Sequence, residues 1–281
     1  MSLSTIDYAD RVRSAGLNVY FVAEGAKNGH IRLERAVPAN PTCNCYSIAK
    51  AFTVTAIGML VDRGLVAPET RVYDILADKF PEGFDPKWKE VTLHHVMLHQ
   101  IGIDRDCADI DNETGETYPK GKDYLTPILS LPIPYEVGSY NKYSDAAYYL
   151  LSRVIERVSG QDLADLMRPV LMETMDFKEF AWSTCPFGYA MGATGLYLRT
   201  DDVVKLGILY LNDGVWNGER IISEEWVRTV LERGYEIKPK KNGWYGKGGM
   251  RGQMLAINPA LGRSVAWHAF DSVPFDAIIR E

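Results

Sequence analysis

The sequence predicts an α+β fold, in which a mainly antiparallel sheet is built from both ends of the chain and carries flanking helices, with a helical lobe between. Strand-like segments occur near both termini, and helix-like segments fill the middle of the chain. A length of 281 residues suffices for one large domain or two modest ones. We expect a discontinuous sheet domain at residues 1–65 and 200–281 and a mostly helical domain at 66–199.

The N-terminal part of the chain predicts a hairpin followed by a helix. Residues 17–23 and 31–37 are rich in apolar and β-branched side chains, and the glycine-containing segment 25–29 joins them. An apolar helix is predicted to begin near Ser47 and to stop near Gly64.

The remaining elements follow from turn residues and hydrophobic spacing. Seven prolines between residues 68 and 140 predict short helices joined by long loops. The amphipathic helix at 145–158 ends before Gly160, which is a typical stop residue. Further helices are predicted at 162–174, 200–212 and 223–234, strands at 253–258 and 263–269, and a tail helix at 273–280.

Composition and charge exclude several function classes. A formal charge of −6 argues against a nucleic-acid partner and provides no cationic membrane patch. The sequence contains no run of 18 apolar residues, so we expect no membrane span. The first residues lack the basic start and apolar core of a signal peptide, which favours the cytoplasm, or an extracytoplasmic location if a leader was removed. The four cysteines are expected to be thiols.

Ser47-Ile48-Ala49-Lys50 forms an S-x-x-K sequence at the start of the apolar helix. Residues three apart share a helix face, so the Ser47 hydroxyl and the Lys50 amine should lie together. A serine hydroxyl is a poor nucleophile at neutral pH, and a neighbouring amine can take its proton. S-x-x-K sequences also occur on helix surfaces, but the residues after Lys50 are too apolar for a surface, and burying a lysine without a partner is costly. We therefore interpret Ser47 as a nucleophile and Lys50 as its partner.

Two further segments carry candidate chemistry. Tyr143-Ser144-Asp145 directly precedes the helix at 145–158, and its alternative interpretation is a loop aromatic followed by a helix cap. Lys247-Gly248-Gly249 lies just before a predicted strand, and its alternative interpretation is a flexible turn with a solvated lysine. The two glycines would also let a substrate lie against the strand backbone.

Together these segments resemble the serine β-lactamase and penicillin-binding-protein superfamily, which carries S-x-x-K, a second S-D-N or Y-x-N sequence, and K-T-G. A second sequence that starts with Tyr143 resembles the branch of class C β-lactamases, D-alanyl-D-alanine carboxypeptidases, D-aminopeptidases and esterases. Supporting segments lie at 91–102, 143–160, 193–202, 212–220 and 247–259. The resemblance implies a β-lactamase/transpeptidase-like fold and a serine acyl hydrolase without cofactor or metal.

The resemblance also implies a role for each residue. Ser47 would attack an acyl carbon, Lys50 would favour its deprotonation, and Tyr143 would act as general base and later activate water. A free tyrosine has a pKa near 10, so base catalysis at pH 7 requires a shift of roughly 3 units, about 4 kcal/mol. The ammonium groups of Lys50 and Lys247 would supply that field. By analogy, the oxyanion would lie on the backbone N–H groups of Ser47 and Met250, and the predicted substrate-binding residues are Asp145, Gly248, Gly249 and Met250.

The sequence departs from the family pattern at two positions. Asp145 stands where many members carry asparagine, and an ionised aspartate cannot donate to a substrate carbonyl. Gly248 replaces a threonine or serine and so removes a hydroxyl from the predicted site. Both changes favour an esterase or a D-amino-acid peptidase over an efficient β-lactamase.

Other patterns carry less weight. His95 and His99 have the spacing of two metal ligands on one helix face, but Val96 stands where the H-E-x-x-H pattern requires glutamate.

The partner that the resemblance implies is a small acyl substrate: an ester, a D-peptide or a β-lactam. The alternative is a penicillin-binding or sensor-like protein of the same fold with little or no turnover, because fold analogy does not fix a substrate.

Overall fold

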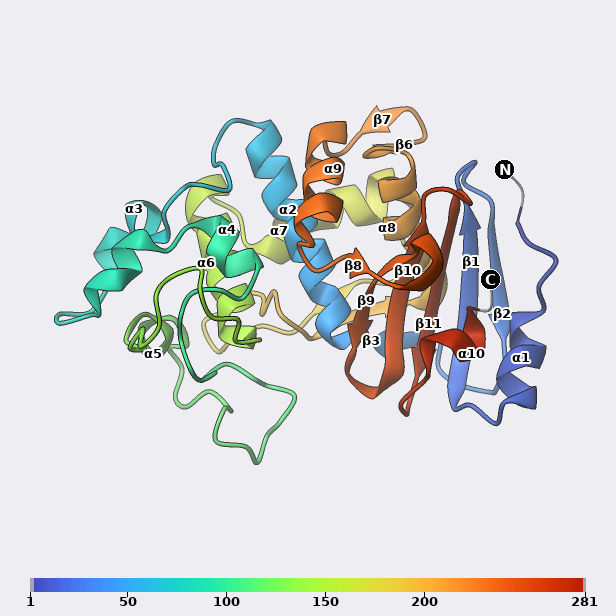
Figure 1. Cartoon of the computed structure of the whole chain (residues 1–281), viewed down its shortest axis with the longest axis horizontal. Helices are drawn as coiled ribbons and strands as arrows, with labels where there is room; N and C mark the ends of the chain where they lie inside the picture. Colours follow the sequence, from blue (N-terminus) through green and yellow to red (C-terminus); the bar gives the residue numbers. More distant parts are fainter. Residues whose placement is uncertain (1–2, 280–281) are drawn as a thin grey trace. The chain divides into compact units, whose positions relative to one another are not determined.

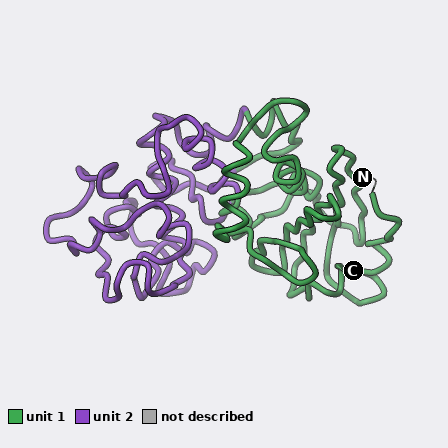
Figure 2. The backbone as a smooth tube through the Cα atoms, turned by 45° about the horizontal axis from the view of Figure 1, so that its top comes forward, with its two compact units in different colours: residues 1–51, 170–181, 196–281 green, residues 52–169, 182–195 purple. Residues whose placement is uncertain are grey.

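The computed structural model describes residues 3–279, and the chain divides into two compact units (Figure 2). Within the described residues, unit 1 comprises 3–51, 170–181 and 196–279, and unit 2 comprises 52–169 and 182–195. Both ends of the chain belong to unit 1. The domain ranges 1–65, 66–199 and 200–281 stay a prediction, and the two compact units are divided at other residues.

Unit 1 is built on a six-stranded sheet with the order β2-β1-β11-β10-β9-β8 (Figure 1). The N-terminal strand β1 pairs antiparallel with the C-terminal strand β11, and Val22 lies opposite Trp267. The predicted antiparallel sheet from both chain ends is therefore confirmed. Its strands are β1 (Val19–Ala26), β2 (Ile31–Arg35), β8 (Lys238–Pro239), β9 (Tyr245–Gly249), β10 (Gln253–Asn258) and β11 (Arg263–Ala269).

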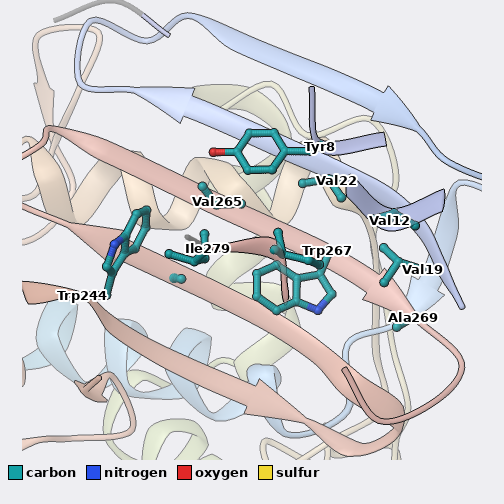
Figure 3. Packing of buried hydrophobic residues seen from close by; sticks show 11 residues of the cluster. Tyr8, Val12, Val19, Val22, Trp244, Val265, Trp267, Ala269 and Ile279 are labelled. Carbon is teal, nitrogen blue, oxygen red and sulfur yellow. The ribbon is translucent and has the colours of Figure 1, made fainter. Parts of the chain in front are cut away.

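The two faces of this sheet bury different partners, because side chains alternate along each strand. On one face, Trp267 and Trp244 pack among aliphatic side chains with helices α1 (Tyr8–Ser14) and α10 (Phe275–Ile278) (Figure 3). On the other face lies α8 (Thr200–Leu211), which packs on β1, β10 and β11.

Small residues set the closeness of α8 to the sheet. A Cβ atom on Gly25 of β1 would lie 2.5 Å from the side chain of Ile208, and one on Gly207 would lie 2.0 Å from Ser264 Oγ. Ser264 Oγ also donates a hydrogen bond to the Val204 carbonyl at 3.1 Å. A larger side chain at either glycine would require these neighbouring side chains or the helix to shift.

The other elements of unit 1 are short. Strand β3 (Thr42–Asn44) pairs with β5 (Leu196–Arg199), and β4 (Ala181–Trp182), at the boundary between the units, is the third strand of this sheet. Helix α9 begins after the cap residue Ser223 and ends at Gly234, which adopts a left-handed conformation. The bounds are β6 (Val215–Trp216), β7 (Glu219–Arg220), α9 (Glu224–Arg233) and the helical turns η1 (Tyr46–Ile48), η5 (Lys241–Gly243) and η6 (Met250–Gly252).

Unit 2 is helical, as predicted for the middle of the chain. Its longest helix, α6 (Asp145–Ser159), is contacted by α3, α4, α5 and α7. Helix α2 (Ala49–Asp62) starts in unit 1 and continues into unit 2, and it is buried along nearly all of its length, as its apolar sequence predicts. The other bounds are α3 (Val72–Leu76), η2 (Ala77–Lys79), η3 (Pro86–Glu90), α4 (Leu93–Met97), α5 (Leu125–Leu129), α7 (Leu163–Arg168) and the π-helical η4 (Pro169–Thr174), which continues into unit 1.

Two differences from the predicted elements lie in the C-terminal part of the chain. Lys247-Gly248-Gly249 precedes strand β10, as predicted, but it is itself part of strand β9, because β8 and β10 pair on either side and offset the low strand propensity of glycine. The predicted tail helix at 273–280 is the shorter α10, and Arg280 lies outside the described residues. Within residues 3–279, no helix combines the length and the apolarity that crossing a membrane requires.

Candidate active site

The S-x-x-K sequence forms a compact turn at the start of α2. Ser47 lies in η1, and Lys50 lies in the first turn of the helix. The Lys50 Nζ atom donates to Ser47 Oγ at 3.2 Å, and the Lys50 side chain is fully buried. The structure therefore places an amine in hydrogen-bond reach of a serine hydroxyl, which is the arrangement that activates such a nucleophile.

The residue before Ser47 adopts a backbone conformation that non-glycine residues rarely adopt. Tyr46 has φ +46°, and its N–H group donates to Asn44 Oδ1 at 2.8 Å. The N–H group of Cys45 donates to the Leu196 carbonyl at 2.7 Å. These bonds hold the left-handed residue in place and fix the direction in which the Ser47 turn leaves β3.

A buried polar chain lies behind this turn. The Cys45 Sγ atom is 3.6 Å from His268 Nε2, and Thr200 Oγ1 is 2.9 Å from His268 Nδ1. All three side chains are buried, and burial lowers the pKa of His268 to about 4 and raises the pKa of the Cys45 thiol. Both groups are therefore neutral at pH 7, and the chain ties the Ser47 turn to β11.

Strand β9 packs directly against the Ser47 turn. A Cβ atom on Gly249 would lie 2.5 Å from the Cys45 carbonyl oxygen, whereas one on Gly248 would meet nothing closer than 3.5 Å. The close approach of β9 to the turn thus requires glycine at position 249. The structure brings Ser47, Lys50 and the Lys247-Gly248-Gly249 segment together within unit 1.

Lys247 has an acidic neighbour that the sequence did not indicate. Its ammonium group forms an ion pair with Glu236, and the two side chains are only 9% and 1% exposed. Glu236 lies between α9 and β8 with φ +66°. The Glu236 carboxylate balances the charge of this ammonium group. Lys247 therefore contributes less to the positive field than the sequence analysis predicted, since that analysis treated both Lys50 and Lys247 as uncompensated charges.

Met250 follows β9 in the turn η6 and is 45% exposed. The next residue, Arg251, has φ +59°, and its guanidinium carbon lies 4.9 Å from the ring centroid of Phe270. This contact holds the β9–β10 turn against the end of β11. The role of the Met250 N–H group as an oxyanion donor stays a prediction.

Tyr143 and Asp145 belong to unit 2, where a buried histidine holds the segment. The Ser144 N–H group donates to His99 Nδ1 at 3.2 Å, and the His99 ring centroid is 4.5 Å from that of Tyr143. His99 is 2% exposed and has φ +59°, whereas Tyr143 is 47% exposed. His99 thus fixes the backbone and the ring that precede α6 and leaves the phenol accessible.

The first turn of α6 is capped by a carboxylate from a distant part of the chain. Asp106 accepts hydrogen bonds from Ser144 Oγ at 3.1 Å, from the Asp145 N–H group at 2.7 Å and from the Ala146 N–H group at 3.0 Å. Ser144 Oγ itself accepts from the Ala147 N–H group, so the cap interpretation of this serine holds as well. Sequence reasoning missed Asp106 and His99 because only the fold brings them to this helix.

Asp145 lies in an acidic cluster. Carboxylate oxygens of Asp109, Asp111 and Asp145 lie within 4.8 Å of one another, and Thr194 Oγ1 donates to Asp111 at 2.5 Å. Carboxylate oxygens suit hard cations, but acidic clusters of this kind are common without an ion. Nothing else in the described part of the chain points to a metal at this cluster.

Comparisons with known proteins place the chain in a family. Residues 14–277 match the family described as Beta-lactamase, so the chain belongs to the Beta-lactamase family, as the three sequence segments predicted. It is 26% identical over 204 residues to 6-aminohexanoate-dimer hydrolase from Paenarthrobacter ureafaciens, a match that covers 67% of this chain and 50% of that protein. The chain spans about half the length of the curated relatives it matches.

Two solved structures share the fold. A penicillin binding protein from Bacillus halodurans superposes with a TM-score of 0.70 at 17% identity, covering 98% of each chain. A class C beta lactamase from Rhodobacter sphaeroides superposes with a TM-score of 0.68 at 18% identity, covering 96% of this chain and 95% of the other. The predicted α+β, β-lactamase-like fold is therefore confirmed.

Proposed function

We propose that this chain is a serine acyl hydrolase that forms an acyl-enzyme on Ser47. The observation that carries the proposal is the hydrogen bond from Lys50 Nζ to Ser47 Oγ, in a turn that Tyr46 and β9 hold in place. A buried lysine aimed at a serine hydroxyl has a chemical use, since it accepts the proton that the nucleophile must lose. Membership of the Beta-lactamase family supports the same assignment.

The reaction divides into two steps. Ser47 Oγ attacks the acyl carbon of an ester, amide or β-lactam and passes its proton toward Lys50. The leaving group takes this proton from Lys50 as its bond to the acyl carbon breaks. Tyr143 then takes a proton from the water that attacks the acyl-enzyme, and it gives this proton to Ser47 Oγ as the bond from Ser47 to the acyl carbon breaks. The N–H groups of Ser47 and Met250 stabilise the oxyanion in both steps. The roles of Tyr143, Lys247 and Met250 rest on the family resemblance.

The charges in unit 1 make Lys50 the main proton acceptor in this proposal. Lys247 is paired with Glu236, so its field on the reacting groups is reduced. We assign Lys247 to substrate positioning beside Gly248 and Gly249. Asp145 offers acceptors in place of an asparagine amide, which favours an ester or a D-amino-acid peptide over a β-lactam.

The substrate class is a small acyl compound. A relative named as a hydrolase of 6-aminohexanoate dimers supports turnover of small linear substrates.

Turnover by matched variants tests the proposal. Wild-type protein, Ser47→Ala and the exposed-serine control Ser272→Ala are compared on p-nitrophenyl butyrate and nitrocefin. We expect Ser47→Ala to lose at least about 10³-fold in kcat/KM, and Ser272→Ala to match the wild type. Equal rates for all three proteins would refute the hypothesis that this chain is a serine hydrolase. A stable penicillin adduct without turnover would support the alternative, a ligand-binding protein of the same fold.

A further inference from the structure

Strand β2 forms one edge of the six-stranded sheet in unit 1 (Figure 1). It pairs with β1 on one side, and among residues 3–279 no strand pairs with its other side. The opposite edge is β8, which has only two residues and ends in Pro239. A short strand with a proline is a poor template for a further strand, whereas β2 has five residues and contains neither glycine nor proline. Of the two edges of this sheet, β2 is therefore the one that can accept another strand.

The hydrogen bonds at the two ends of the β1–β2 pair fix which backbone groups of β2 point outward. The Ala26 N–H group donates to the His30 carbonyl at one end, and the Ala36 N–H group donates to the Tyr20 carbonyl at the other, both at 2.9 Å. In an antiparallel pair, residues that bond to the neighbouring strand alternate with residues whose backbone groups point away from it. The even-numbered residues of β2 therefore bond to β1. The N–H and C=O groups of the odd-numbered residues point outward: Ile31, Leu33 and Arg35.

The sequence of β2 is complementary to itself in one register. Leu33 is the middle residue of the strand, and 37% of its surface is exposed. When two copies of β2 pair antiparallel with Leu33 opposite Leu33, each outward residue meets an outward residue, and Arg32 lies opposite Glu34 of the other copy. A shift of the register by one pair of residues places Arg32 opposite Arg32 or Glu34 opposite Glu34. Like charges directly opposite each other destabilise a strand pair, so the charges select the register centred on Leu33.

Contacts within one copy hold these two charges in place. Arg32 Nε lies 2.9 Å from Glu34 Oε1, and Arg32 also donates to the Ser4 carbonyl at 3.2 Å. Glu34 Oε2 accepts from the Ala9 N–H group of α1 at 2.7 Å. Both side chains are therefore ordered before association, which reduces the entropy lost when they meet a second copy.

We propose that two copies of this chain associate through β2 and join their sheets into one continuous antiparallel sheet. The interface is isologous, and its two-fold axis passes beside Leu33. Backbone hydrogen bonds link the outward residues, the two Leu33 side chains pack together, and Arg32 of each copy pairs with Glu34 of the other. This association uses neither Ser47 nor its neighbours, so it does not depend on the proposed hydrolase.

Charge substitutions at the two-fold axis test the proposal. Sedimentation velocity of the full chain between about 5 and about 500 μM should show a concentration-dependent dimer for the wild type. In Leu33→Lys and in Leu33→Glu, like charges meet at the axis, and we expect the Kd of the dimer to rise at least about 10-fold in each. Leu65→Lys places the same charge on an exposed leucine of unit 2 and should leave the Kd unchanged.

A mixture of the two axis variants tests the register. Equal amounts of Leu33→Lys and Leu33→Glu bring opposite charges together, and we expect a heterodimer that is tighter than the dimer of either variant alone. A wild type that stays monomeric over the whole range would overturn the proposal. A dimer that Leu33→Lys does not weaken, or a mixture as dissociated as its components, would overturn it as well.

Hydrogen exchange of the wild type provides a test that needs no substitution. In the dimer, the outward N–H groups of β2 are bonded to the second copy. We expect the amides of Ile31, Leu33 and Arg35 to exchange at least about 10-fold more slowly at the highest protein concentration than at the lowest. Exchange at these amides that is independent of protein concentration would contradict the proposed interface.

Discussion

The contact between β9 and the Ser47 turn leaves no room for a Cβ atom at position 249, and this gives a prediction for Gly249→Ala. In Gly249→Ala, the new Cβ atom would lie 2.5 Å from the Cys45 carbonyl oxygen and 3.0 Å from Gln253 Cβ. Since protein Cβ atoms essentially never come closer than 3.0 Å to a non-bonded heavy atom, the strand and the turn must separate by at least about 0.5 Å. We expect a loss of about 1–3 kcal/mol in the free energy of unfolding.

The same displacement should also lower the catalytic rate, by a free energy similar to the loss of stability. The Cys45 carbonyl lies two residues before Ser47, so the nucleophile moves with it. Misplacement by about 1 Å costs roughly 100-fold in rate, and we expect kcat/KM for p-nitrophenyl butyrate to fall by about 10- to 100-fold. Urea unfolding and initial rates measure the two effects separately.

The neighbouring glycine supplies the control. A Cβ atom on Gly248 would lie 3.5 Å from Met254 Cε and 3.7 Å from the Gln253 carbonyl oxygen, which are ordinary contacts. Gly248→Ala should therefore unfold within about 0.5 kcal/mol of the wild type and lose less activity than Gly249→Ala. If the two variants have the same stability and the same rate, the reasoning from this contact is refuted.

Three further predictions concern the groups that support the site. Asp106→Ala removes the acceptor of the first turn of α6, and we expect urea unfolding to show a loss of about 1–3 kcal/mol. Glu236→Gln leaves the buried Lys247 ammonium without its carboxylate, and we expect a loss of about 3–5 kcal/mol, most of which Glu236→Leu with Lys247→Met should recover. The pKa of His268 is lowered to about 4 in the folded chain, whereas an unperturbed histidine has a pKa near 6.5. As the pH falls below 6.5, the unfolded chain therefore binds a proton that the folded chain does not. We expect the free energy of unfolding to fall by up to about 3 kcal/mol between pH 6.5 and pH 4. The pH dependence of unfolding should be flatter over this range in His268→Gln.

Each of these predictions has a contradicting result. An Asp106→Ala protein as stable as the wild type would mean that other groups cap α6. A double variant at Glu236 and Lys247 that is less stable than Glu236→Gln would mean that the ion pair is not the source of the loss. Parallel pH profiles for wild-type protein and His268→Gln would mean that His268 does not titrate differently in the folded and unfolded chain.

Local patterns were sufficient for much of the fold. Apolar strand segments near both termini predicted the sheet that β1 and β11 join, and the apolar sequence after Lys50 predicted the buried helix α2. Helix α6 ends one residue beyond the predicted position, before Gly160 in a left-handed conformation. The three-residue spacing of S-x-x-K anticipated the Ser47–Lys50 hydrogen bond, because it depends only on helical geometry.

The supporting groups of the site were not predictable in this way. Asp106, His99 and Glu236 act on residues that are distant in sequence or on another element, and nothing in their local sequence marks these contacts. Strand β9 was missed as a strand because its glycines carry little intrinsic preference, and its neighbours in the sheet decide its conformation. The balance of charge at Lys247 likewise depends on a carboxylate that tertiary packing supplies.

Identification of the acylated residue tests the central claim most directly. The protein is treated with a fluorophosphonate, digested, and analysed by mass spectrometry, with Ser47→Ala and Ser272→Ala treated in parallel. We predict a single phosphonylated peptide, which contains Ser47, in the wild type and in Ser272→Ala, and no adduct in Ser47→Ala. An adduct on another residue, or ester hydrolysis that persists in Ser47→Ala, would contradict the assignment of Ser47 as the nucleophile.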